Sequence, residues 1–354
     1  MNYIEQVKAA LWGEQIAAEP LNADLLRMHM QQGTGPLVFP LLPMTPQMKM
    51  VCLQNMQNQV KLSHTLQVAW SALTQAGIRP VLMKGAGLAT LYLSPEMRTW
   101  GDIDLFVGVD QYHPACKVMR DTFPDALKFD EELDHYKHYN IIADGVSIET
   151  HRVSVGFQHP IDARRYAKIE HFGMTHAVPL TTNHSPLTLT IPEPTFNTLF
   201  VMLHAWEHAT TQGANIRQFC DLTLLLHHNA AQIDRPRLKS WLQALHLLDV
   251  WRLYMYILVQ HLGLPENEAP FYENSLAVRG EKFLTDLLSG KLIAPKSEGT
   301  TTKNRFARKW HTMKERLKNA KRIGQYSPEY ARHMRAETWL HGALRLFAKD
   351  RHWE

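Results

Sequence analysis

The chain has 354 residues, of which 45% are hydrophobic and 20% are charged. This composition excludes a disordered chain, a collagen-like repeat and a small disulfide-stapled protein, and the length predicts two or three domains. The formal net charge of +4 permits a polyanionic partner without requiring one.

Cysteine usage and apolar stretches favour a cytoplasmic protein without a membrane span. The three cysteines are odd in number and far apart, which fits neither a disulfide framework nor a C-x-x-C metal site. Residues 1–5 lack the basic and apolar regions of a signal peptide. The most apolar stretch, residues 247–264, is interrupted by Asp249 and Arg252, whereas a membrane span needs about 20 mostly apolar residues.

The chain begins with a helical pattern that ends near Gly77, where residues 50–76 carry apolar side chains at helical spacing. Short apolar runs of strand length follow, at 81–83, 103–107, 139–143 and 146–150. From Pro194 onward the pattern is helical again, with predicted helices at 197–208, 218–228, 238–264 and 275–288.

Proline clusters at 33–46 and 179–194 mark the breaks between these parts. The predicted fold class is therefore α+β, with a small mixed sheet flanked by N-terminal and C-terminal helical regions. The predicted domains are an N-terminal helical region at 1–76, a catalytic domain at 77–190 and a C-terminal helical domain at 191–354.

The second predicted strand carries two aspartates on one face. Strand side chains alternate, so Asp102 and Asp104 point the same way while Ile103 and Leu105 point into the core. Paired carboxylates repel each other unless a cation lies between them, and Mg²⁺ takes such oxygen ligands together with substrate phosphates. Glu149, on the strand at 146–150, joins them as a third metal ligand if the two strands are neighbours. This set is suited to two metal ions in a phosphoryl displacement.

Lys84 and Gly85 stand at a predicted strand-to-helix turn. There, backbone N–H groups and the lysine ammonium would lie near a phosphate tail. Arg98, just before the two aspartates, is a second candidate for binding the same phosphates.

These residues resemble the nucleotidyltransferase fold of the DNA polymerase beta superfamily, and more closely an uncharacterised family of bacterial nucleotidyltransferases. That family has an apolar strand, K-G, a helix with L-Y, R-x-x-G-D-I-D-L-x-V, and later an acidic residue followed by His. The matching residues are Lys84, Gly85, Leu91, Tyr92, Arg98, Gly101, Asp102, Ile103, Asp104, Leu105, Val107, Glu149 and His151.

The resemblance implies a polymerase beta-like core and an enzyme that moves a nucleoside monophosphate from a nucleoside triphosphate, ATP among them, to a hydroxyl acceptor. Two Mg²⁺ ions, with Mn²⁺ as the alternative, would be its cofactors. The acceptor would be a small molecule, a protein or RNA. The superfamily's first motif is Gly-Ser, whereas this chain has Gly85-Ala86, so triphosphate contact would rest on backbone amides and Lys84.

A later helix also matches the family loosely and is expected to contribute to the acceptor pocket. The candidate acceptor residues of this segment are His204, His208, Arg217 and Asp221. His151, two residues after Glu149, is a further candidate. The same helix matches the H-x-x-E-H pattern of inverted zinc peptidases through His204, Glu207 and His208, and a downstream acid such as Glu266, Glu268 or Glu281 would be its third ligand.

Two further alternatives are less favoured. The segment 85–90 is close to the dinucleotide fingerprint of dehydrogenases, although Thr90 replaces its last small residue. A catalytically silent nucleotide-binding regulatory protein with the same fold would keep nucleotide binding without pyrophosphate release.

The basic excess lies in the tail. Residues 301–354 have 14 Lys or Arg and 5 Asp or Glu, a net of +9, which leaves a net of −5 for residues 1–300. Between 303 and 335 the basic residues alternate with apolar ones at helical spacing, which favours an amphipathic helix packed on the body. The alternative is a basic surface that binds RNA or another acidic partner.

Overall fold

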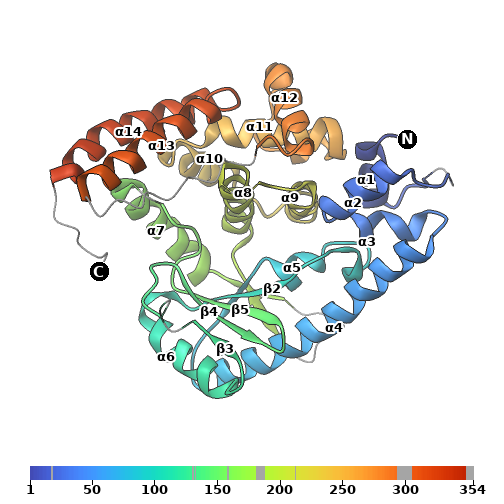
Figure 1. Ribbon diagram of the computed structural model, residues 1–354, viewed down its shortest axis with the longest axis horizontal. Helices are drawn as coiled ribbons and strands as arrows, with labels where there is room; N and C mark the ends of the chain where they lie inside the picture. Colours follow the sequence, from blue (N-terminus) through green and yellow to red (C-terminus); the bar gives the residue numbers. More distant parts are fainter. Residues whose placement is uncertain are drawn as a thin grey trace.

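The computed structural model describes the chain except residues 17–18, 130, 132, 158, 181–187, 212, 293–304 and 348–354. A five-stranded sheet lies at one end of the molecule, in the lower part of Figure 1, and most of the C-terminal helices lie above it. This mixed α+β architecture with flanking helices confirms the predicted fold class.

The sheet combines antiparallel hairpins with one parallel pair. Its strand order is β1-β2-β5-β4-β3, in which β2 and β5 are parallel and the other neighbours are antiparallel. A separate two-stranded sheet pairs β6 with β7. The strands are β1 (Val81–Met83), β2 (Asp102–Phe106), β3 (Leu127–Lys128), β4 (His138–Ala143), β5 (Val146–His151), β6 (Val178–Leu180) and β7 (Leu189–Ile191).

One face of the five-stranded sheet packs against two helices. α4 (Pro46–Gln75) crosses beneath the sheet in Figure 1 and α6 (Gly108–Thr122) lies beside it. Their buried side chains form one hydrophobic core with alternate residues of β2 and β5, among them Ile103, Leu105 and Ile148. The intervening residues of β2 and β5 therefore face the opposite side, toward the C-terminal helices.

The second hydrophobic core lies within the helices and joins the two ends of the chain. Trp12 on α1, for example, donates a hydrogen bond of 2.6 Å to the carbonyl of Leu262 at the end of α11. The N-terminal elements are α1 (Tyr3–Trp12), α2 (Ala23–Gln31), α3 (Gly35–Val38) and η1 (Phe39–Leu41). The later elements are α5 (Gly85–Ala89), η2 (Pro95–Met97), α7 (Pro160–Thr175), α8 (Pro194–Thr211), α9 (Ile216–Asn229), α10 (Arg235–Ala244), α11 (Leu248–Leu262), η4 (Glu266–Glu268), η5 (Asn274–Leu276), α12 (Ala277–Leu288), α13 (Arg305–Ile323) and α14 (Pro328–Phe347).

The prediction of a single helix at 238–264 is wrong, because a turn separates α10 from α11. Leu245 is the C-cap of α10, His246 has φ +57° and Leu247 is the N-cap of α11. Leu245 and Leu247 are fully buried, so the apolar periodicity continues through the break and hides it. No glycine or proline marks this turn.

The predicted domain boundaries remain a prediction. α4 packs on the sheet, whereas α1 contacts α11, so the segment 1–76 contributes to both hydrophobic cores. Among the described residues, none of the helices combines the length and the apolar character needed to cross a membrane.

The basic segment predicted at 303–335 belongs largely to α13 and α14, which pack against each other. Residues 303–304 lie outside the described part of the chain. Met313 and Ala320 are buried, whereas Lys314 and Lys318 are exposed, as expected of an amphipathic helix packed on the body. Arg322 donates to the carbonyl of Thr210 at 2.7 Å and ties α13 to α8.

Candidate active site

Three carboxylates gather on the sheet face that looks toward the C-terminal helices. Asp104 on β2 pairs directly with Glu149 on β5, and Asp102 lies two residues earlier on the same face. Asp104 is fully buried, while the side chain of Asp102 is 45% exposed and that of Glu149 is 23% exposed. The neighbouring strands thus bring together the three acids that the sequence analysis selected.

Lys84 supplies the cation of this group. Its Nζ lies 3.0 Å from Asp104 Oδ2 and 4.0 Å from Asp102 Oδ2. The turn from β1 to α5 is strained, because Lys84 has φ +52°, a region that non-glycine residues avoid. The next residue must be small: a Cβ on Gly85, which has φ +41°, would lie 3.2 Å from the Trp100 ring.

His151 ties two of the carboxylates together. Its Nε2 lies 3.0 Å from Asp104 Oδ1 and 3.0 Å from Glu149 Oε2. Burial opposes protonation, yet the hydrogen bonds with these two acids raise the pKa of His151. His138 on β4 lies next to it, with Nδ1 3.6 Å from Glu149 Oε2. The ligand atoms of His138, Glu149 and His151 all lie within 4.8 Å of one another, as a metal site requires.

The charges of the three acids are unevenly compensated. Burial opposes ionisation of Asp104, but the Lys84 ammonium and His151 lower its pKa well below the usual range. The charge of Asp104, followed by burial, raises the pKa of Asp102. Negative charge therefore remains in excess at Asp102, the most exposed of the three carboxylates, where a cation from solvent would relieve it.

Arg98 lies beneath the Lys84–Gly85 turn and is paired with an acid from α9. Its Nε and Nη2 donate to the two oxygens of Asp221 at 2.7 and 2.9 Å, and its Nη1 donates to the Gly85 carbonyl at 3.2 Å. The Tyr92 hydroxyl also donates to Asp221 at 2.8 Å. Arg98 and Asp221 are both almost completely buried. The predicted phosphate contact of Arg98 and the predicted acceptor contact of Asp221 are not part of this arrangement, which holds the turn against α9.

Two histidines of α8 face the acidic group from the other side. His204 Nε2 lies 3.5 Å from Lys84 Nζ, and the His204 and His208 rings are 4.5 Å apart. Burial, followed by the charge of Lys84, lowers the pKa of both imidazoles. Arg217 donates to the Thr99 carbonyl at 2.6 Å. Of the predicted acceptor residues, His151 and His204 therefore contact the acidic group or Lys84 directly.

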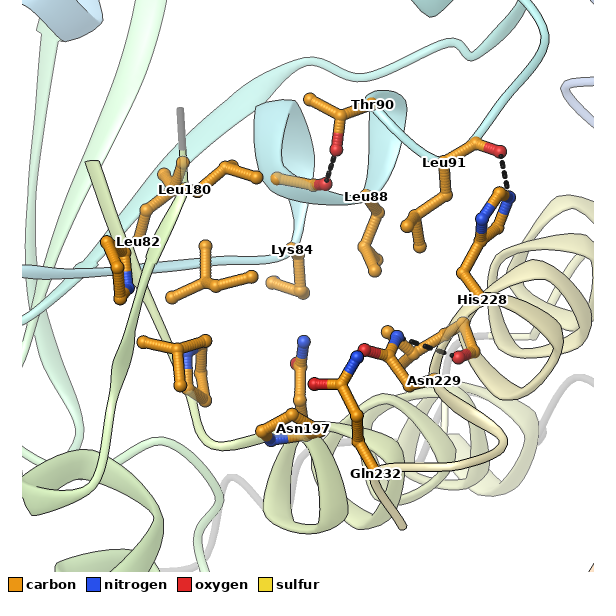
Figure 2. A pocket seen from close by; sticks show the side chains of 17 residues that line it. Leu82, Lys84, Leu88, Thr90, Leu91, Leu180, Asn197, His228, Asn229 and Gln232 are labelled. Carbon is orange, nitrogen blue, oxygen red and sulfur yellow. Dashed lines mark hydrogen bonds between the residues drawn. The ribbon is translucent and has the colours of Figure 1, made fainter. Parts of the chain in front are cut away.

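A cavity of about 240 Å³ begins at Lys84 and extends between α5 and the helices α8 and α9. Figure 2 shows Asn197 of α8 and Gln232 of the turn after α9 reaching toward Lys84 and Leu88. Asn197 is 5% exposed, and its Oδ1 has no hydrogen-bond partner among the described residues. The cavity is thus mainly apolar, with amide groups on one side.

Comparison with known proteins agrees with this geometry. A family described as "Uncharacterised nucleotidyltransferase" matches residues 24–263, which is more than half of the chain. The chain belongs to this family. No curated protein matches it. Among solved structures, an antigenic nucleotidyltransferase-like protein from Paracoccidioides brasiliensis is similar over 50% of this chain and 90% of that chain, with 18% identity and a TM-score of 0.31.

Membership confirms the resemblance drawn from the K-G and G-D-I-D motifs. The family assignment supports a transferase, and a nucleotide is the substrate that the family implies. Nucleotidyltransferases generally use divalent metal ions, and the acidic and histidine groups around Glu149 are of a kind that binds metal.

Neither alternative enzyme class fits the structure. In the described part of the chain, the groups of three or more clustered metal ligands do not include His204 or His208. Two of the three acids expected to complete a zinc peptidase are paired with other histidines: Glu268 lies 2.7 Å from His227, and Glu281 lies 2.7 Å from His261. The dehydrogenase interpretation fails because β1 and β2 are antiparallel, whereas a dinucleotide-binding unit needs parallel strands.

A buried glutamate that no local sequence pattern indicates lies on α7, beside the residues that follow β5. Glu170 on α7 accepts hydrogen bonds from the backbone N–H of Ser154 at 2.6 Å and from the Ser154 hydroxyl. Ser154 follows β5, three residues after His151, so this contact fixes the exit of the strand. Burial raises the pKa of Glu170 to about 7.

This shift predicts a pH dependence of stability. Because the ordinary pKa of 4.5 rises to about 7 on folding, the native state binds more protons than the unfolded state between these values. The free energy of unfolding is expected to fall by about 3 kcal/mol as the pH rises through this window, and the contribution is constant above it. Urea unfolding at a series of pH values measures it.

Glu170→Gln is the matched variant, since its amide oxygen still accepts from both Ser154 donors. We expect the variant to lack the extra slope between pH 4.5 and about 7. If wild type and Glu170→Gln lose stability in parallel across this range, the assigned titration is wrong.

Proposed function

We propose that this protein transfers a nucleoside monophosphate from a nucleoside triphosphate to a hydroxyl acceptor and releases pyrophosphate. One observation carries the proposal: Asp102, Asp104 and Glu149 lie together on neighbouring parallel strands, and the Lys84 ammonium lies 3.0 Å from Asp104. Three carboxylates beside one lysine are suited to metal-assisted displacement at a polyphosphate.

The donor set fits divalent cations. Hard ions such as Mg²⁺, or Mn²⁺ in its place, take carboxylate oxygens, and the charge of Asp104 already raises the pKa of its neighbour Asp102. We assign the two ions to Asp102, Asp104 and Glu149. When bound, they supply stabilisation of charge on the phosphate and lower the pKa of the acceptor hydroxyl.

In the proposed reaction, Lys84 and the backbone amides that follow it orient the triphosphate. The acceptor oxygen forms a bond with the α-phosphorus, and the bond from phosphorus to the bridging oxygen breaks. Pyrophosphate leaves with that electron pair. The proton of the hydroxyl passes to a carboxylate of the acidic triad, which consists of Asp102, Asp104 and Glu149. The Arg98–Asp221 pair acts as a positioning element, because Arg98 holds the Gly85 carbonyl from below.

The cavity beside Lys84 is our candidate for the nucleoside. Its volume of about 240 Å³ is below the roughly 300–1,000 Å³ of pockets that enclose a drug-sized ligand, so it suits one part of a nucleotide. The buried Asn197 Oδ1, which has no hydrogen-bond partner within the described part of the chain, would accept a hydrogen bond from a base amino group. His204 and His208, on the same helix, remain the candidates for contact with the acceptor.

Nucleotide binding tests this proposal. We expect a nonhydrolysable nucleoside triphosphate to bind in the presence of Mg²⁺ and to bind more weakly when EDTA removes the metal. Asn197→Ala is expected to weaken binding of the preferred nucleotide about tenfold, which corresponds to the free energy of one hydrogen bond. Asn267→Ala, at an exposed position of η4, is the matched control.

Calorimetric titration with each of the four nucleotides measures both effects. Absence of binding by all four would refute the proposed function. Equal affinities of wild type and Asn197→Ala would show that the nucleoside does not bind in the cavity. The proposed role of Asp102, Asp104 and Glu149 would be unaffected.

A further inference from the structure

A second group of metal-ligating side chains lies away from the acidic site. It joins three segments: the start of α7, the turn between α10 and α11, and α14. Figure 1 shows α7 running from the sheet toward α14. We call the group the α7–α14 cluster, and its members are His159, Asp162, His246, His333 and Glu337.

Four side chains of the cluster are linked in a ring of close contacts. His333 Nε2 lies 2.7 Å from Asp162 Oδ2 and 2.8 Å from Glu337 Oε1. His159 Nδ1 lies 2.8 Å from the same Glu337 oxygen and 3.7 Å from Asp162 Oδ2. All four side chains are at most 20% exposed. Imidazole nitrogens and carboxylate oxygens thus alternate around this ring of contacts, which joins the start of α7 to α14.

These separations match the edges of a tetrahedral metal site. Ligands about 2.0–2.1 Å from a tetrahedral Zn²⁺ lie about 3.3 Å from each other. The observed separations of 2.7 to 3.7 Å bracket this value. The charges balance when both imidazoles are neutral, because the two carboxylates then offset a divalent ion.

The surroundings of the cluster orient its ligands. Arg165 Nη1 lies 3.3 Å from the second oxygen of Asp162 and donates to the Ala244 carbonyl at 2.9 Å, so Asp162 is held toward α10. His246 stacks on the His333 ring, with centroids 3.8 Å apart. It is exposed, and its positive φ places it in the α10–α11 turn beside a ligand of α14. Such outer contacts are typical of metal sites.

We propose that the α7–α14 cluster binds one transition-metal ion of the zinc class, through His159, Asp162, His333 and Glu337. Mixed imidazole and carboxylate ligands favour Zn²⁺ over Mg²⁺, which takes oxygen ligands. The ion fastens α14, which lies beyond the family match at 24–263, to α7 of the matched region. The site is structural and separate from the acidic triad.

Metal titration of the full chain tests the proposal. EDTA-treated protein is titrated with Zn²⁺, and separately with Co²⁺, in excess Mg²⁺ that occupies the acidic triad. We expect one Zn²⁺ per chain, a rise in the melting temperature, and the visible absorption of tetrahedral Co²⁺.

His333→Ala is expected to weaken Zn²⁺ binding by about 100-fold or more and to remove the Co²⁺ spectrum. The matched control is His261→Ala, which also breaks a histidine–glutamate pair of 2.7 Å but lies outside the cluster. If circular dichroism reports that His333→Ala does not fold, Glu337→Gln replaces it. The proposal is wrong if wild type does not bind stoichiometric Zn²⁺, or if the variant at His333 or Glu337 binds Zn²⁺ with wild-type affinity. The cluster would then be only an ion-pair network.

Discussion

Asp102→Asn is expected to reduce nucleotide transfer by at least about a hundredfold while leaving the fold intact. Asp102 carries the negative charge that the protein itself compensates least: its carboxylate is 45% exposed and 4.0 Å from Lys84. The asparagine keeps the shape of the side chain but loses the charge that a metal ion needs. The loss is therefore expected in turnover and in metal-dependent nucleotide binding.

Two comparisons make this prediction specific. Asp110→Asn removes an exposed aspartate at the start of α6 and is expected to retain full activity. Asp104→Asn is expected to abolish transfer as well, but it also leaves the buried Lys84 and His151 without their shared partner, so it is expected to lower stability. An active Asp102→Asn with wild-type metal dependence would show that the triad is not catalytic.

Asp221→Ala is expected to lower the free energy of unfolding by about 3–5 kcal/mol. The substitution leaves the Arg98 guanidinium buried without its bidentate partner and the Tyr92 hydroxyl without its acceptor. Since Arg98 also holds the Gly85 carbonyl, the strained Lys84–Gly85 turn loses its support at the same time. Chemical denaturation measures the effect.

Asp121→Ala is the matched control for this experiment. Asp121 pairs with Lys117 at 2.6 Å, but both side chains are well exposed, and such pairs contribute about 0–1 kcal/mol. A similar small loss for Asp221→Ala would contradict the assigned role of the buried pair.

Local sequence patterns predicted much of the fold and the centre of the site. Alternation along β2 and β5 placed Asp102, Asp104 and Glu149 on one face because side-chain direction in a strand depends only on position. The same logic could have found His138. Asp144 and Gly145, with φ +50° and +76°, form a tight hairpin turn whose register pairs His138 with His151 by simple counting.

Local sequence patterns did not predict contacts between segments that lie far apart along the chain. Arg98 and Asp221 are 123 residues apart, and periodicity does not reveal that a buried acid of α9 meets that arginine. The α7–α14 cluster depends on the turn at His246, which lies between two buried leucines and carries no glycine or proline signal. Both arrangements follow from how the helices pack, which the sequence pattern leaves open.

The fate of the triphosphate tests the central claim most directly. Wild-type protein is incubated with Mg²⁺, a cell extract and nucleoside triphosphate labelled either at the α-phosphate or at the γ-phosphate. We predict that the α-label moves to an acceptor and that the γ-label appears in pyrophosphate, and that Asp102→Asn does neither. Transfer of the γ-label to an acceptor, or retention of both labels in the nucleotide although it binds, would contradict nucleotidyl transfer.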